Sequence, residues 1–240
     1  MKKTNRALIC RVFLVILGIS AVFGAIQSTC KESGDVALTF DFGPGPFTGK
    51  LLDILLERKI PATFHVTTDL FRNLTLTEYV RRAHNEGHTI GIFIPESPVW
   101  AAMDEFPEDD PVFTSGIIQQ ITIASNWITS ITGTQPRYIR FGSKKHIPLQ
   151  LRRTIEQQLG LTVTKPKTEI RDESNKMDSI WNSLSKGLLN SDPKVNSFIL
   201  RQRDTMPNSV ASVEKIVEFL TEKGYNIVPL TTCVPPRQPK

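Results

Sequence analysis

The chain has 240 residues, 40% of them hydrophobic and 22% charged, which is ordinary for a globular protein with one α/β domain or two small ones. Its formal net charge is +5, but residues 1–24 contain no acid and hold four of the basic residues: Lys2, Lys3, Arg6 and Arg11. The rest of the chain has 25 basic and 24 acidic residues. This balance leaves no basic patch that would indicate a DNA- or RNA-binding protein.

Residues 1–24 have the three parts of a secretory signal peptide. A basic stretch, "MKKTNR", precedes the apolar run "VFLVILGISAVFGAI", and the small residues that follow predict cleavage after Gly24. The alternative is an uncleaved membrane anchor, although the apolar run of about 15 residues is shorter than the roughly 20 that cross a bilayer. We therefore expect a protein that is secreted or held at the cell surface or wall, with no membrane span in the mature chain.

Strand-like and helix-like patterns alternate along the rest of the chain. The predicted strands cover residues 36–41, 62–67, 88–93, 138–141, 161–164, 197–200 and 226–230. The predicted helices cover residues 47–58, 75–86, 113–132, 148–159, 176–189 and 208–223. This alternation predicts a parallel sheet covered by helices, which at this length can curl into a barrel of about seven strands. Since no internal repeat or linker is visible, we expect one domain, residues 30–235.

Two cysteines remain outside the signal segment, Cys30 and Cys233. They flank the first and last predicted elements, and neither has the neighbouring cysteines or histidines that a metal site needs. In an oxidising compartment, such a pair predicts a disulfide. Asn73 begins the glycosylation sequon Asn-Leu-Thr between two predicted elements, so we expect it to be a surface acceptor.

Four stretches resemble one family. "VALTFDFGPGPFTGKLLDILLERKIPATF" (36–64) resembles the opening of the polysaccharide deacetylases, the NodB-homology family that includes the chitin deacetylases. The resemblance continues through "YVRRAHNEGHTIG" (79–91), "ITGTQPRYIR" (131–140) and the closing segment from "SFIL" (197–200) to "VEKIVEFLTEKGYNIVPL" (213–230). It implies a distorted (β/α) barrel whose substrate groove lies at the C-terminal ends of the strands. It also implies removal of N-acetyl groups from chitin-like or peptidoglycan-like sugars with zinc or another divalent metal.

The residues at the family's metal-binding positions differ from the family pattern. The first motif, Thr-Phe-Asp-Asp-Gly-Pro, contains the general base and then a metal ligand, and the matching residues are Asp41 and Phe42. In the second motif, which matches "GHTIGIFIPES", Phe93 and Ser97 stand where the family has two histidine ligands. We therefore expect the base position to be kept and no metal to be bound. We also expect Phe42 to contact Phe93 across the floor of the pocket.

The third and fourth motifs are also degenerate. Arg140 matches the arginine of Arg-Pro-Pro-Tyr in the groove wall, but the residues after it do not match. We expect Arg140 to persist as a salt-bridge partner of Asp41. The fourth motif, an Asp-Trp segment, has only loosely spaced candidates in Asp172 and Trp181.

The fifth motif supplies the general acid, a histidine, in the family. In "FILRQRD" the matching position is Gln202, and glutamine cannot donate a proton at neutral pH. A shift of one residue would place Arg201 or Arg203 there, and neither is an acid suited to neutral pH.

Two functions follow from these patterns. The first is a secreted non-enzymatic relative of the deacetylases that binds chitin or a related wall polysaccharide, binds a surface partner, or has a structural role. The second is a working deacetylase with a rebuilt metal site, in which Asp41 would act with His65 or His146. His65 falls on a strand near the core and His88 at a position that is not a ligand in the family, so we expect structural roles for both.

Overall fold

The computed structural model describes residues 25–67, 73–96, 110–142 and 147–237. Its strands are β1 (Asp35–Gly43), β2 (Thr63–Val66), β3 (Thr89–Ile94), β4 (Tyr138–Phe141), β5 (Thr162–Val163), β6 (Thr168–Glu169), β7 (Phe198–Arg203) and β8 (Asn226–Ile227). Its helices are α1 (Thr48–Arg58), α2 (Leu74–Asn85), α4 (Pro111–Thr132), α5 (Leu149–Arg153), the π-helical turn η3 (Thr154–Gln158), α6 (Met177–Gly187), α7 (Pro207–Glu222) and α8 (Leu230–Cys233).

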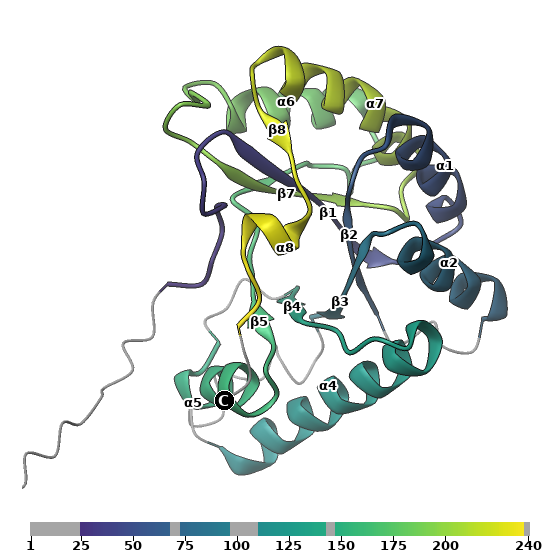
Figure 1. The fold of residues 1–240 in the computed structure, drawn as a ribbon, viewed down its shortest axis with the longest axis vertical. Helices are drawn as coiled ribbons and strands as arrows, with labels where there is room; N and C mark the ends of the chain where they lie inside the picture. Colours follow the sequence, from purple (N-terminus) through teal and green to yellow (C-terminus); the bar gives the residue numbers. More distant parts are fainter. Residues whose placement is uncertain (1–24, 68–72, 97–109, 143–146, 238–240) are drawn as a thin grey trace, which may run out of the picture.

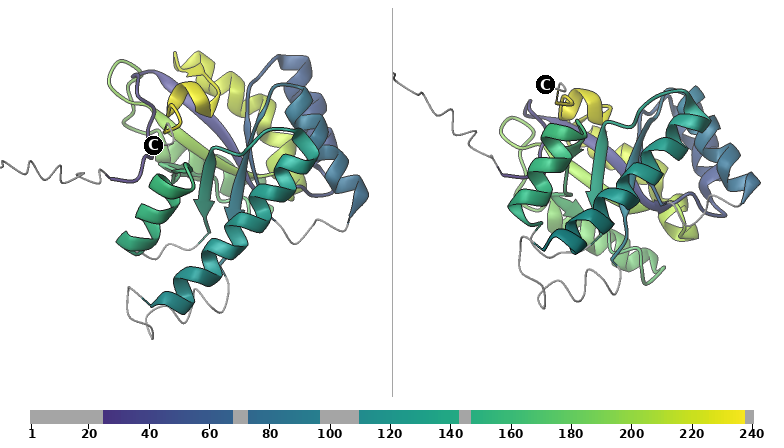
Figure 2. Two further views of the ribbon diagram at one scale, coloured as in Figure 1. Left: turned by 60° about the horizontal axis from the view of Figure 1, so that its bottom comes forward. Right: turned by 90° about the horizontal axis from the view of Figure 1, so that it is seen from below.

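The strands form one parallel sheet that curls into a half-barrel. Seven of them lie in the order β5-β4-β3-β2-β1-β7-β6, and β8 pairs with the start of β1. Every pairing is parallel. The long helices surround the outer side of the curl (Figures 1 and 2). This is the distorted barrel expected from the sequence, and it brings the C-terminal ends of the strands together at one end of the molecule.

The two faces of the sheet have different environments because side chains alternate along a strand. Val36, Leu38 and Phe40 of β1 point outward into the main core between sheet and helices. Ala37 points inward, where it joins a second apolar cluster with Tyr138, Ile199, Leu230, Val234 and both cysteines. Further along the same inner face of β1 comes Asp41, so the inner face changes from apolar to charged toward the C-terminal ends of the strands.

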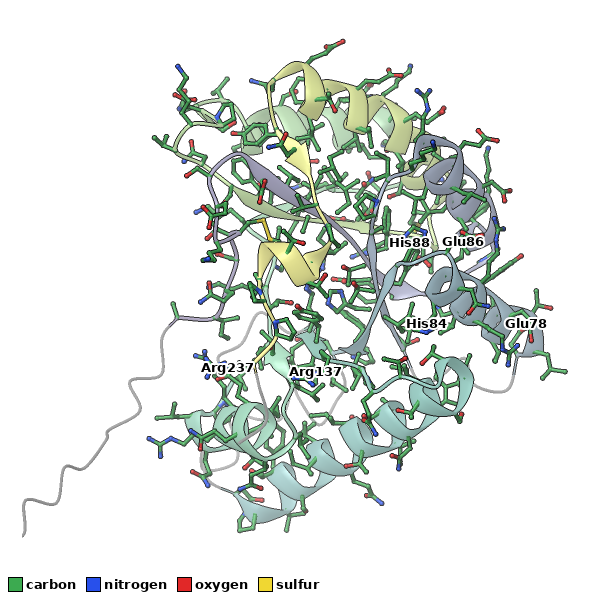
Figure 3. The ribbon with its side chains drawn as sticks, viewed as in Figure 1. Glu78, His84, Glu86, His88, Arg137 and Arg237 are labelled. Carbon is green, nitrogen blue, oxygen red and sulfur yellow. A yellow bond between two sulfur atoms is a disulfide. The ribbon has the colours of Figure 1, made fainter. Side chains whose placement is uncertain are left out.

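The disulfide expected between Cys30 and Cys233 is present, with an S–S distance of 2.06 Å. It is the yellow bond in Figure 3. Cys30 lies next to the start of β7, since its carbonyl accepts a hydrogen bond from Ser197 Oγ at 3.0 Å. The disulfide therefore joins the two ends of the domain at the N-terminal ends of the strands. Within the described ranges, no helix is long and apolar enough to cross a membrane.

Two predicted elements differ in kind from the structure, and one strand was not predicted. The strand expected at 226–230 ends at Ile227 and is followed by helix α8, because Pro229 lacks an N–H for the sheet and precedes the first residue of that helix. The helix expected at 148–159 continues from α5 into the π-helical turn. Strand β6 was not predicted, since two residues are too few to show a periodic pattern.

Candidate functional site

The C-terminal end of β1 is irregular where the family motif falls. The pairing of β1 with β2 shifts register between Asp41 and Gly43, and the Gly43–Pro44 peptide bond is cis. Phe42 at this bulge has a φ of +72°, in the left-handed region that few bulky residues adopt. This conformation costs roughly 1–2 kcal/mol, and bulges of this kind re-aim a side chain. The bulge of β1 thus places a phenylalanine, Phe42, where the family's first motif has a metal ligand.

Asp41 is fully buried and paired with Arg140, as expected. Arg140 Nη1 donates to Oδ1 at 3.0 Å and to Oδ2 at 3.2 Å of Asp41, and also to Thr39 Oγ1 at 2.7 Å. Burial alone would raise the pKa of Asp41, but Arg140, together with His65 and Arg201, holds it below its ordinary value. Asp41 is therefore an ionised carboxylate enclosed by its partners.

His65 on β2 lies against the same carboxylate. Its Nδ1 is 3.0 Å from Asp41 Oδ1, and its side chain is completely buried. Burial and the positive charge of Arg140 lower the pKa of His65 to about 4, so the ring is neutral near pH 7. A Cβ at Gly91 would lie 2.7 Å from His65 Cδ2, so the neighbouring strand has room for this ring only because residue 91 is glycine. His65 is a core histidine, as expected from its position.

Phe42 and Phe93 contact each other, as predicted. Their ring centroids are 4.4 Å apart with the planes at 49°. Phe93 is 1% exposed, and a Cβ at residue 142 would lie 2.9 Å from its Cζ, so Gly142 also makes room for this ring. The two rings fill the position beside Asp41 with carbon atoms that cannot coordinate an ion.

Two arginines of β7 cover Phe42, and the sequence patterns did not predict this arrangement. The guanidinium carbons of Arg201 and Arg203 lie 5.9 Å and 4.7 Å from the centre of the Phe42 ring. Arg203 is held by Asp172, whose Oδ2 accepts its backbone N–H at 2.6 Å and whose Oδ1 lies 3.8 Å from its Nε. The alternation of arginines in "RQR" was the only signal in the sequence, because it places Arg201 and Arg203 on one face of a strand.

Gln202, expected at the position of the general acid, points the other way. Its Nε2 lies 3.3 Å from the carbonyl oxygen and 3.4 Å from the Oγ of Ser209, which belongs to helix α7. It is therefore on the helix-covered face of the sheet, whereas Arg203 pairs in register with Asp41. On β7, Arg203 is therefore the residue that lies beside Asp41 on the inner face of the sheet.

The described residues do not fit a divalent metal. No group of three or more His, Cys, Asp or Glu side chains is placed to hold an ion in the described parts of the chain. Beside Asp41 there are two phenylalanine rings without donor atoms and two guanidinium groups whose positive charge opposes a cation. Ser97, the third ligand position, and His146, a possible replacement ligand, lie outside the described residues.

A second buried carboxyl group, Asp204, lies behind the bulge of β1. Thr48 Oγ1 donates to its Oδ2 at 2.6 Å, and a Cβ at Gly43 would lie only 2.1 Å from that oxygen. Burial raises the pKa of Asp204 to about 7, although the bond from Thr48 lowers it. No sequence pattern indicated this carboxyl group, which links the end of β7 to the start of α1.

The other residues considered in the sequence, His88, Trp181 and Asn73, have structural roles. His88 Nδ1 accepts the backbone N–H of Ala62 at 3.3 Å, and His88 lies near Glu86 at the end of α2 (Figure 3), in the structural role expected of it. Trp181 of α6 packs edge-on against Phe219 of α7. Asn73 is exposed and is the N-cap residue of α2, accepting the N–H of Leu76.

Comparisons with known proteins identify the family of this chain. The profile of the family described as polysaccharide deacetylase matches residues 28–164. A chitin deacetylase of Colletotrichum lindemuthianum is 28% identical over 219 residues, covering 85% of this chain and 81% of that protein. A peptidoglycan-N-acetylglucosamine deacetylase of Bacillus cereus is 27% identical over 201 residues, covering 81% and 68%.

The fold is also shared with solved structures. The structure of a chitin deacetylase from Colletotrichum lindemuthianum superposes with a TM-score of 0.74 at 26% identity, covering 88% of this chain and 92% of that one. The motifs, the curled parallel sheet and the profile match lead to one conclusion: the chain belongs to the polysaccharide deacetylase family, of the chitin deacetylase-like kind.

Proposed function

We propose that this protein is a non-catalytic member of its family that binds a wall polysaccharide, chitin or a related polymer. The observation that carries the proposal is the Phe42–Phe93 contact beside Asp41, where the family motifs have metal ligands. Arg201 and Arg203 over Phe42 support it, because they add positive charge where a cation would have to enter.

The chemistry of Asp41 supports the same proposal. Water has a pKa of about 15.7, and bound zinc lowers it to about 7, so a carboxylate without a metal is a weak base for this reaction. Asp41 is also 0% exposed and contacts Arg140 through both carboxylate oxygens. We infer that Asp41 has become a structural anion that balances a buried arginine.

The chain's amino-terminal pattern and its disulfide support a location outside the cell. We propose that residues 1–24 are a signal peptide, that residues 30–235 form the secreted domain, and that Asn73 carries a glycan. The Cys30–Cys233 disulfide supports an oxidising compartment, where such bonds persist.

A working deacetylase with a rebuilt metal site is the second candidate, and one observation favours it. His65 Nδ1 lies 3.0 Å from Asp41, so a nitrogen and a carboxylate are already adjacent. Both groups are 0% exposed, however, and Arg140 occupies the carboxylate, so an ion would have to displace a buried guanidinium.

The test has a catalytic arm and a binding arm. With chitin oligosaccharides and added zinc, cobalt or nickel, we expect no acetate above the blank without protein and no stoichiometric metal in the folded protein. With insoluble chitin, we expect the protein to co-sediment, and the oligosaccharide in solution to compete.

Two results would contradict the proposal. Metal-dependent acetate release that disappears in Asp41→Asn would establish the second candidate instead. Absence of the protein from the chitin pellet, and from pellets of related wall polysaccharides, would remove the binding function. The triple change Phe42→Asp, Phe93→His and Ser97→His is the matched gain-of-function control, because it returns ligand atoms to all three positions.

A further inference from the structure

A cavity of about 650 Å³ lies between strand β6, the loop that follows it, and helix α6. This is within the range of about 300–1,000 Å³ that small-molecule sites occupy. Neither Asp41 nor Phe42 nor Phe93 lines it, so it adjoins the site around Asp41 without sharing these residues. The described residues around it are polar or charged, apart from Ile170 and Gly187.

The charges around this cavity are unevenly paired. Its two acids, Glu169 and Glu173, lie 3.6 Å from Arg201 and 4.0 Å from Arg203, the arginines that rest on Phe42. By contrast, its three cations, Lys167, Arg171 and Lys186, have no acidic partner within 4 Å among the residues that the structure describes. The negative charges of the two acids are thus neutralised by arginines of β7. The three cations therefore leave the cavity with an excess of positive charge.

Neutral hydrogen-bonding groups lie between these cations. Ser179, Asn182 and Ser183 of α6 line the cavity with two hydroxyl groups and an amide. Ser183 Oγ already accepts the backbone N–H of Arg171 at 2.9 Å and donates to the carbonyl of Ile180, so it fixes the loop after β6 against the helix. One wall of the cavity is therefore a loop and a helix joined by hydrogen bonds, and it carries neutral polar groups as well as cations.

We propose that this cavity binds an acidic saccharide, meaning a hydroxyl-rich molecule that carries a carboxylate or sulfate. The three cations supply charge-assisted hydrogen bonds to the oxyanion, and these are about twice as strong as neutral ones. The hydroxyl and amide groups of α6 suit sugar hydroxyls. Among the residues that the structure describes, none that lines the cavity is aromatic, so recognition depends on charge rather than on stacking, and a neutral chitin oligosaccharide is not its ligand. The site goes beyond the proposed function and does not depend on it.

The experiment measures binding by calorimetry to four probes: a galacturonic acid tetramer, a sulfated tetrasaccharide, N-acetylchitotetraose and inorganic phosphate. We expect binding of at least one acidic tetrasaccharide, weakening as salt screens the charges. The double variant Lys167→Gln, Lys186→Gln should bind it at least about tenfold more weakly. The matched control is Lys50→Gln, Lys215→Gln on α1 and α7, which removes the same charge from exposed positions elsewhere and should change affinity less than about twofold.

A second variant tests whether a charge placed in the cavity has more effect on binding than charges removed elsewhere. Asn182→Asp adds one acid inside the cavity at an exposed position, and it should weaken binding to a similar extent while the circular dichroism spectrum is unchanged. Equal loss in the cavity and control doubles would overturn the proposal, since binding would then follow net charge alone. Phosphate bound as tightly as the tetrasaccharides would overturn the saccharide assignment. Binding of N-acetylchitotetraose alone, unaffected by these variants, would overturn this inference and leave the proposed function standing.

Discussion

Asp204 shows how one buried side chain sets a pH dependence. Its pKa is raised by burial to about 7, from an ordinary value of 3.8, so the folded protein keeps the proton over a range where the unfolded chain has lost it. The stability that this group contributes is fully present below about pH 4 and is lost as the pH rises through 7. His65, whose pKa is lowered to about 4, acts in the opposite direction, because its contribution is lost as the pH falls from about 6.5 toward 4.

We predict that Asp204→Asn removes the loss of stability at higher pH. Asparagine has nearly the same shape, stays neutral, and can accept the hydrogen bond from Thr48. Between about pH 5 and about pH 8 the wild type should lose up to about 3 kcal/mol relative to this variant, since one pKa unit corresponds to about 1.4 kcal/mol. Urea unfolding at both pH values measures the difference, and His65, present in both proteins, cancels. Parallel pH profiles for the two proteins would contradict the prediction.

The sequence predicted some of these side-chain contacts and missed others for one reason. The Phe42–Phe93 contact follows from motifs whose flanking residues align without gaps, and the Asp41–Arg140 pair follows from the arginine of the third motif. The face of Gln202 could not be predicted, because a shift of one residue turns a strand side chain to the opposite side of the sheet. The segment "RQRD" (201–204) can be aligned with the fifth family motif in more than one way, so the sequence does not determine which residue matches the histidine.

At the scale of elements, the bulge at the end of β1 depends on a missing side chain. Gly43 pairs with Val66 of β2 after the register shift, and Asp204 fills the space above it. A methyl group there would lie 2.1 and 2.2 Å from the two carboxyl oxygens, so the carboxyl group, which Thr48 holds, or the bulge itself would have to move. The bulge, the start of α1 and the end of β7 are therefore one packed unit.

We predict that Gly43→Ala destabilises the fold by about 2–4 kcal/mol, through overpacking of this unit. The control is Gly116→Ala on α4, where an added methyl meets nothing within 4 Å. That change should raise stability by about 0.5–1 kcal/mol, because alanine favours a helix more than glycine does. Chemical denaturation of the two variants gives both values. A Gly43→Ala protein as stable as the wild type would show that the bulge can relax.

At the scale of the whole molecule, the alternation of elements was enough to predict the curled parallel sheet. The strand-like runs predicted seven of the eight strands in the described residues. What the alternation could not predict is how far the curl closes, because β6, at one end of the strand order, has two residues, too few to show a periodic pattern. The cavity beside β6 lies at this end of the sheet, so no sequence pattern indicated it.

We predict that the disulfide contributes strongly to the stability of the domain. The bond closes a loop with a sequence separation of 203 residues, for which the chain-entropy relation gives up to about 5 kcal/mol. Cys30→Ser with Cys233→Ser, or reduction of the wild type, should therefore lower the urea midpoint. The double variant also controls for effects of the reductant itself. Coincident unfolding curves for the oxidised and reduced protein would refute this.

The same bond decides how the domain responds to mechanical tension. A pulling force applied outside Cys30 and Cys233 first breaks the contacts of the flanking residues, such as the bridge of Gln27 with Thr164 and the bond from the Arg237 N–H to Thr162 Oγ1. It then passes from one sulfur to the other and bypasses the strands and helices between them. While the bond is oxidised, stretching such a tether extends only the flanking residues. Once it is reduced, the load reaches the start of β1 directly, and full extension of the released loop would lengthen the tether by roughly 700 Å at about 3.4 Å per residue. The disulfide therefore keeps the domain folded when tension is applied at its two ends.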